Sequence, residues 1–179
     1  GIRKGDTSRS KRGGEYMDSG SIVIEGDIGM HCGNFMSGGT IEIRGNADSW
    51  LGREMRGGTI LCRGNAGHYC ATGYRGEKKG MQGGSVEVFG NTGDFCAEYL
   101  TGGMVHIHGS TGDFPGVEMR GGELIIEGDA TRPCGNMKNG SCVILGTVHD
   151  MLPTFEKIEQ RVLPAWKITA DVYNGDVAN

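Results

Sequence analysis

The chain contains 179 residues, and its 22 acidic and 18 basic side chains leave a net charge of −4. This charge gives no general attraction to nucleic acid, and no apolar run approaches the ~18 residues of a membrane-spanning helix. No secretory leader, with its charged and apolar regions, opens the sequence, so we expect a cytoplasmic protein that binds neither nucleic acid nor membrane.

Residues 1–18 are expected to form part of a coil. The segment GDTSRSKRGGEYM (5–17) resembles GDIGMHCGNFM (26–36), which is the second half of a later repeat. The first half of that coil is missing, which suggests a fragment, a processed form, or a chain whose partner supplies the edge. Because an open coil end leaves backbone groups unpaired, a cap, a partner or self-association is expected there.

Residues 19–150 repeat a pattern about every 19 residues. Each repeat opens with a glycine, and a second follows six residues later, as in Gly20 and Gly26. Between them, as in SIVIE and TIEIR, the second and fourth residues are apolar, which predicts a strand with one buried face. The fixed period predicts an all-β, right-handed parallel β-helix solenoid of about seven coils of ~19 residues. Both glycines of a pair are expected to allow positive φ at a corner.

The third repeat contains seven extra residues, within the stretch TGYRGEKKGM (72–81). Insertions in a solenoid form surface loops on one face. Two interpretations stay open: a solvated loop, or a loop that docks a partner. In the second case the candidate interface residues are Tyr74, Arg75, Lys78 and Lys79.

A second candidate interface is an aromatic column, eleven residues after the opening glycine. It contains His31, Trp50, Tyr69, Phe95 and Phe114. These rings either point outward as a protein interface or cover a corner of the core.

The six cysteines are interpreted as core residues. Four follow their opening glycine by twelve residues, and two occupy inward strand positions: Cys32, Cys70, Cys96 and Cys134, then Cys62 and Cys142. A free cysteine packs as a small apolar residue, and the sequence has no CxxC metal motif. A disulfide between Cys70 and Cys96 stays open for an oxidising compartment.

The histidines His106 and His108 share the outward face of one strand, where Glu87 and Glu127 from flanking coils could approach them. A metal site is one interpretation, and a solvated or partner-covered polar ladder is the favoured one. No nucleophile, base and carboxylate arrangement is recognisable. We therefore predict no catalytic, cofactor-binding or metal-binding residue in this chain.

Residues 151–179 leave the repeat, because glycines become scarce and charged and aromatic residues appear. This tail is expected to be a short helix or loop with a final strand, either folded back along the rod or capping its end.

Three stretches resemble the third, β-helical subunit of formylmethanofuran dehydrogenase: GDIGMHCGNFMSGGTIEIRGNADSWLGREMRGG, GYRGEKKGMQGG and GGELIIEGDA. The inserted loop is the most specific of them. The coil pattern alone is shared with the C-terminal β-helix domain of glutamate synthase large subunits. The resemblance implies a right-handed parallel β-helix that docks catalytic subunits and is itself non-catalytic.

The resemblance also implies a reaction. The family's complex reduces CO2 and attaches it to methanofuran as a formyl group, in methanogenesis and related one-carbon metabolism. Partner subunits are implied to carry a molybdenum or tungsten pterin and an amidohydrolase-type metal site, and this chain no cofactor. Three alternatives stay open: a subunit of the methylotrophic formyltransferase/hydrolase complex, a glutamate-synthase-type module, and a metal-dependent hydrolase built on His106 and His108.

Overall fold

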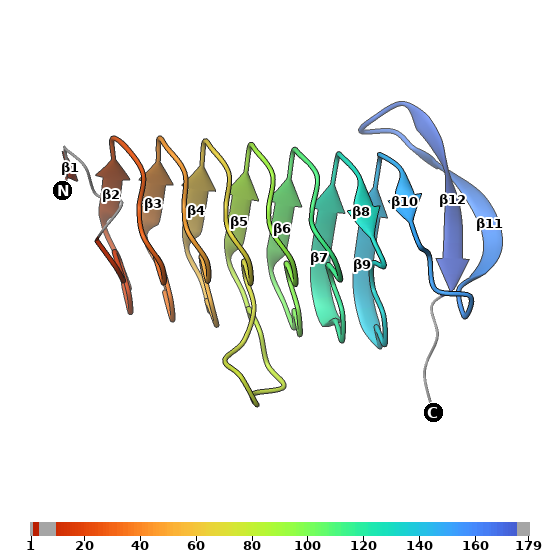
Figure 1. The fold of residues 1–179 in the computed structure, drawn as a ribbon, viewed down its shortest axis with the longest axis horizontal. Coiled ribbons are helices and arrows are strands. Elements are labelled where there is room, and N and C mark those ends of the chain that lie inside the picture. The colour runs from red at the N-terminus through yellow and green to blue at the C-terminus, as the bar shows by residue number, and fades with distance from the viewer. Residues whose placement is uncertain (1, 4–9, 175–179) are drawn as a thin grey trace.

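A computed structural model describes residues 2–3 and 10–174, and it shows coils stacked along one axis (Figure 1). One parallel sheet runs the length of the stack, with the strands in the order β1-β2-β3-β4-β5-β6-β7-β9. These strands are β1 (Ile2–Arg3), β2 (Ser21–Ile24), β3 (Thr40–Ile43), β4 (Thr59–Cys62), β5 (Ser85–Val88), β6 (Met104–Ile107), β7 (Arg120–Ile126) and β9 (Asn139–Ile144). The expected parallel β-helix is confirmed. The described residues contain no helix that could span a membrane.

The core consists of ladders of equivalent side chains from successive coils. Ile41 of β3 pairs in register with Ile60 of β4, which pairs with Val86 of β5, and all three are at most 1% exposed. A second ladder comes from the position three residues before the next opening glycine, and its side chains are equally buried: Met36, Met55, Met81, Leu100 and Met119. The strand alternation therefore predicts the buried face correctly, because each inward residue packs on its equivalents one period away.

The two glycines of each pair serve different purposes. The opening glycine has positive φ, 82° at Gly39 and 85° at Gly58. The closing glycine does not, so the expectation of positive φ at both is wrong for the second. At Gly45 a Cβ would lie 2.6 Å from the carbonyl carbon of Gly26, one coil earlier. The second glycine is thus required by close backbone contact between coils.

The N-terminal coil is more complete than expected. β1 pairs in parallel with β2, with Ile2 opposite Val23, so it occupies the strand position that was expected to be missing. The later part of this coil also stacks as predicted, because the Tyr16 amide donates to the Asn34 carbonyl at 2.8 Å. Residues 5–9 of the predicted half-coil lie outside the described residues.

The sixth repeat, residues 122–139, is one residue shorter than the fifth, residues 103–121. The Cys134 amide donates to the Pro115 carbonyl at 2.8 Å, as the Gly116 amide donates to the Cys96 carbonyl one coil earlier. Cys134 therefore aligns with Gly116, and its assignment to the column of Cys96 is wrong by one position, although it is buried as expected. This coil and the next are joined by two short parallel strands, β8 (Ala130–Thr131) and β10 (Val148–His149).

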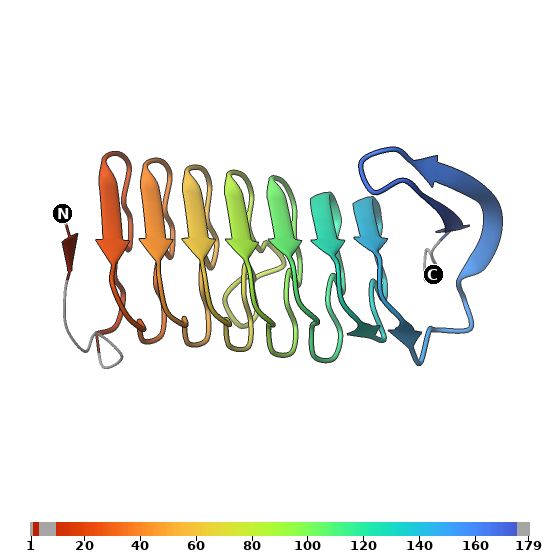
Figure 2. The ribbon, with the colours of Figure 1, turned by 90° about the horizontal axis from the view of Figure 1, so that it is seen from above.

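The C-terminal segment is a twisted antiparallel hairpin of β11 (Glu156–Leu163) and β12 (Ile168–Asn174). It extends beyond the last coil at the end of the rod (Figures 1 and 2). The described part of this tail contains no helix: the strand β11 stands where a short helix or loop was expected, and β12 confirms the expected final strand. Most of β11 is exposed, including Ile158 at 61% and Val162 at 63%.

A candidate docking site between the ring ladder and the inserted loop

The aromatic column forms a continuous stack on the outside of the coils. The centroids of Trp50 and Tyr69 are 5.3 Å apart, those of Tyr69 and Phe95 5.4 Å, and those of Phe95 and Phe114 5.3 Å. The stack continues to His31 at one end, and the Arg132 guanidinium covers Phe114 at the other. We call His31, Trp50, Tyr69, Phe95 and Phe114 the ring ladder.

The backbone explains why the rings and the cysteines face opposite ways. Each ladder residue has positive φ, for example 60° at Trp50 and 58° at Tyr69. This conformation costs a non-glycine residue roughly 1–2 kcal/mol. It turns the ring outward, while the next residue, such as Cys70, points inward and is fully buried. Stacking contributes about 0.5–1.5 kcal/mol per pair, which offsets part of that cost.

All six cysteines are free, and five are buried while Cys142 is half-buried. Cys70 and Cys96 lie in adjacent coils, as predicted, and they share a hydrogen bond rather than a disulfide. That bond, together with burial, raises the pKa of the Cys70 thiol. The interpretation of the cysteines as core residues is confirmed.

The inserted loop is anchored at both ends and exposed at its tip. At its start, the buried Thr72 hydroxyl donates to the Tyr69 carbonyl at 3.0 Å. At its end, the Gly80 amide donates to the Tyr99 carbonyl at 2.8 Å. The tip turns where the Glu77 amide donates to the Tyr74 carbonyl at 2.9 Å. The loop therefore projects from the rod at a defined place (Figure 1).

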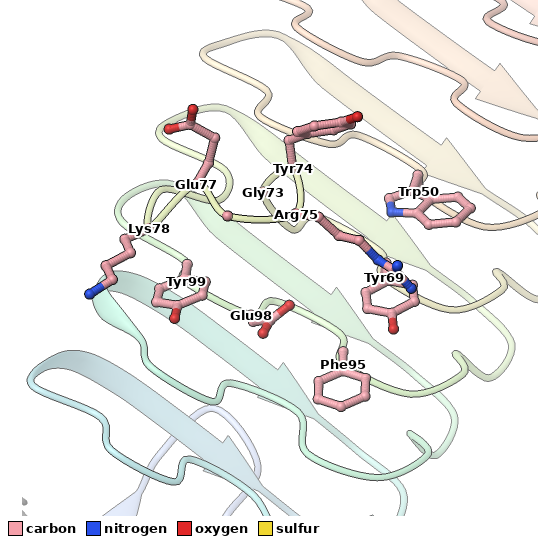
Figure 3. A pocket seen from close by; sticks show the side chains of 11 residues that line it. Trp50, Tyr69, Gly73, Tyr74, Arg75, Glu77, Lys78, Phe95, Glu98 and Tyr99 are labelled. Atoms are coloured by element: carbon pink, nitrogen blue, oxygen red, sulfur yellow. The ribbon is translucent and has the colours of Figure 1, made fainter.

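Between the ring ladder and the loop lies a pocket of about 330 Å³ (Figure 3). It is lined by Trp50, Tyr69, Gly73, Tyr74, Arg75, Gly76, Glu77, Lys78, Phe95, Glu98 and Tyr99. Six of the nine candidate interface residues are among them. Of the other three, His31 and Phe114 are the two ends of the ring ladder, and Lys79 is an exposed loop residue outside the lining. The two candidate interfaces, one on the ring ladder and one on the loop, therefore border one pocket.

Three lining residues are absent from the candidates that the sequence indicates: Glu77, Glu98 and Tyr99. Burial raises the pKa of the Glu98 carboxyl, and the nearby Glu118 raises it further. Burial is also the main reason why the pKa of the Tyr99 phenol is raised, and the Glu118 carboxylate raises it further. Glu98 and Tyr99 belong to the coil that follows the insertion, and this coil packs against the end of the loop. Their position in the repeat places them one coil after the loop, so the repeat spacing is a signal that could have identified them.

A second hollow, of about 420 Å³, lies on the other side of the loop tip. Tyr74 and Glu77 line it as well. In the lining of this second hollow, the buried Arg53 guanidinium lies 5.0 Å from the ring centroids of both Phe35 and Tyr74. Arg53 therefore ties the loop to the preceding coils by cation–π contacts, which are worth about 0.5–2 kcal/mol each.

The pocket suits recognition better than catalysis. Its lining combines five aromatic rings, one of them Tyr74 of the loop, with two loop cations and two acidic side chains. Tyrosine, tryptophan and arginine are the residues that contribute most at protein interfaces. The lining residues include no histidine, cysteine or serine that could serve as a base–nucleophile pair.

The two histidines on the sheet do meet the flanking carboxylates, as the sequence suggested. Nε2 of His108 lies 2.7 Å from Glu87, and Nδ1 of the same ring contacts Glu127. The His106 ring stacks on the His108 ring with centroids 4.2 Å apart. Glu87, His106 and His108 thus form a compact group on the outer face of the sheet.

No protein-family model matches the chain, and no curated protein matches it in sequence. A solved structure does match: the formyltransferase/hydrolase complex (FhcABCD) from Methylorubrum extorquens in complex with methylofuran. One chain of that complex is 29% identical and superposes with a TM-score of 0.74, over 81% of this chain and 54% of its own length. This chain therefore spans about half the length of that neighbour. The match confirms the resemblance that the sequence motifs predict.

Proposed function

We propose that this chain is a non-catalytic β-helix subunit of a formylmethanofuran dehydrogenase complex, in which it docks the catalytic subunits. The observation that carries the proposal is the match to a chain of the formyltransferase/hydrolase complex at 29% identity and a TM-score of 0.74. The assembled complex would reduce CO2 to the formyl group of formylmethanofuran.

The pocket beside the loop supports a docking role. It presents the half-buried rings of Trp50, Tyr69 and Phe95 next to the exposed Arg75 and Lys78. A partner segment that fills it would bury rings that are already held rigid by their stacking, so little side-chain entropy is lost on binding. The loop cations would pair with acidic groups of that partner.

The C-terminal hairpin supports the same role. A two-stranded hairpin alone is marginally stable in water, because it lacks a second layer to cover its apolar side chains. Here Ile158, Val162 and Tyr173 are all exposed. A catalytic subunit seated at this end of the rod would supply the missing layer.

In this proposal the molybdenum or tungsten pterin and the amidohydrolase-type metal site belong to the partner subunits. The cysteines of this chain are poorly suited to such groups, because the thiolate is the form that binds metal. Burial raises the pKa of the Cys32 thiol to about 12 and that of Cys62 to about 11.

A second candidate is a subunit of a formyltransferase/hydrolase complex, which the activity of the matching complex favours. The β-helix would serve the same docking purpose in both. The two candidates differ in whether the purified complex contains a redox centre, so metal analysis of the complex separates them.

The proposal is tested by purifying the complex through a tag on this chain. We expect formyl transfer or CO2-reducing activity in the complex and none in the isolated chain. The double variant R75A/K78A should lower the yield of bound partner subunits, while the charge-matched control K11A/K138A, on exposed sites elsewhere, should not. Activity of the isolated chain, or equal subunit loss in both variants, would refute the proposal.

A further inference from the structure

Four side chains from three successive coils meet on the outer face of the main sheet. Glu87 comes from β5, His106 and His108 from β6 and the residue after it, and Glu127 from the position directly after β7. Each side chain is 20–32% exposed, so the group is shielded from bulk water but still open on one side. Glu87, His106 and His108 each offer one ligand atom, and these atoms all lie within 4.8 Å of one another.

We propose that Glu87, His106 and His108 bind one Zn²⁺ ion. Two imidazole nitrogens and a carboxylate oxygen form a ligand set that zinc uses in open sites, with a fourth position left for water or an incoming group. Imidazole selects against Mg²⁺ and Ca²⁺, which prefer oxygen ligands alone. This departs from the expectation that the chain holds no metal.

The surroundings of the two rings support the assignment. Nδ1 of His108 contacts the Glu127 carboxylate while Nε2 faces Glu87, so Glu127 holds the ring as carboxylates hold metal-bound histidines. Nε2 of His106 is buried and makes no hydrogen bond to the described residues, although Glu127 lies 3.4 Å away. A buried ring nitrogen without such a bond needs an explanation, and rotation of this ring toward a bound ion supplies one.

The two rings are also packed in place. The His108 ring stacks on Phe89 with centroids 4.5 Å apart, and Phe89 in turn lies under the Arg63 guanidinium at 4.7 Å. Because β5 and β6 are hydrogen-bonded neighbours, with Glu87 opposite His106, the ion would join two coils. Zinc would therefore tighten the stack at its middle, on the sheet rather than at the docking pocket.

The test uses the full chain, stripped with a chelator and titrated with Zn²⁺ alone in a calorimeter. We expect one ion per chain and a higher melting temperature with zinc. H106A and H108A should each weaken binding by at least about 100-fold, and E127Q, which keeps the shape but loses the charge, by about 10–100-fold.

Two matched controls are available, because His68 lies 3.6 Å from Asp94 and His149 lies 3.4 Å from Asp129. H68A and H149A remove a surface histidine beside a carboxylate outside the group, and they should leave zinc affinity unchanged. Circular dichroism of each variant establishes that it folds. If no stoichiometric ion binds, or if H106A and H108A bind zinc as well as the controls do, the group is only an ion-pair ladder and the proposal is wrong.

Discussion

The indole of Trp50 lies parallel to the phenol ring of Tyr69, with centroids 5.3 Å apart and planes 6° apart. The two residues are one period apart in the sequence, and both adopt a left-handed backbone conformation. The same relation recurs from coil to coil, so a single period aligns the core on the inside and the ring ladder on the outside.

Replacing Tyr69 with alanine removes two stacking contacts, to Trp50 and to Phe95. At about 0.5–1.5 kcal/mol each, we expect a loss of roughly 1–3 kcal/mol in the free energy of unfolding. Urea denaturation followed by circular dichroism measures it. Tyr69→Phe keeps both stacks and should be close to the parent. Equal losses in the two variants would show that stacking is not the cause.

The closing and opening glycines should respond differently to substitution. Gly45→Val places a side chain against the Gly26 carbonyl, so we expect a loss well above about 1 kcal/mol, because backbone cannot move aside cheaply. Gly20→Ala meets no atom within 4 Å and should cost only the roughly 1–2 kcal/mol of its positive φ. Thermal melting compares them. A smaller effect at Gly45 would contradict the close contact between coils.

Stability should fall in alkaline solution because of the buried thiols. The pKa of Cys32 is raised to about 12 and that of Cys62 to about 11, against ~8.5 in an unfolded chain. Below pH ~8.5 both states keep the protons, so these thiols cause no pH dependence. Above it the unfolded state ionises first, and each thiol lowers the free energy of unfolding by up to about 1.4 kcal/mol per pH unit until its folded pKa is reached.

Melting curves between pH 7 and 11 test this effect. Tyrosines and lysines also titrate in this range, so the comparison is between the parent and Cys32→Ala, whose curve should be flatter above pH ~8.5. Parallel curves would mean that Cys32 ionises freely in the folded protein.

The loop cations should contribute to binding and not to folding. Arg75 and Lys78 are exposed, so R75A/K78A should change the free energy of unfolding by less than about 0.5 kcal/mol. Affinity for the partner subunits should fall by about tenfold or more, with a slower association rate that depends on salt. Surface plasmon resonance against purified partner subunits measures both, and unchanged affinity would place the interface elsewhere.

Much of the fold is predictable because one period governs it. The inward residues of each strand and the buried cysteines follow from position within the repeat. The role of the closing glycines does not follow from position. Spacing alone does not tell whether a glycine is needed for positive φ or for close backbone contact, such as that of Gly45 with Gly26. Counting from Gly122 misplaces Cys134 by one position, because this repeat has one residue fewer than the preceding one between the opening glycine and the cysteine.

The site was only partly predictable for a similar reason. The period identified the ladder rings, and its interruption identified the loop, but neither indicated that the two border one pocket. The shared pocket depends on where the chain leaves the coil, at Gly73, and where it returns, at Gly80. It also depends on Glu98 and Tyr99 of the next coil, which complete the lining. The hairpin lies outside the repeat, so no column could predict its strands.

The central claim is that this chain docks catalytic subunits of a formylmethanofuran-processing complex. Affinity purification from native cells through a tag on this chain, followed by mass spectrometry of the bound proteins, tests it most directly. We predict stoichiometric recovery of a subunit of the pterin-containing or amidohydrolase type, reduced by R75A/K78A. Recovery of glutamate synthase components instead, or of the chain alone under conditions that preserve complexes, would contradict the claim.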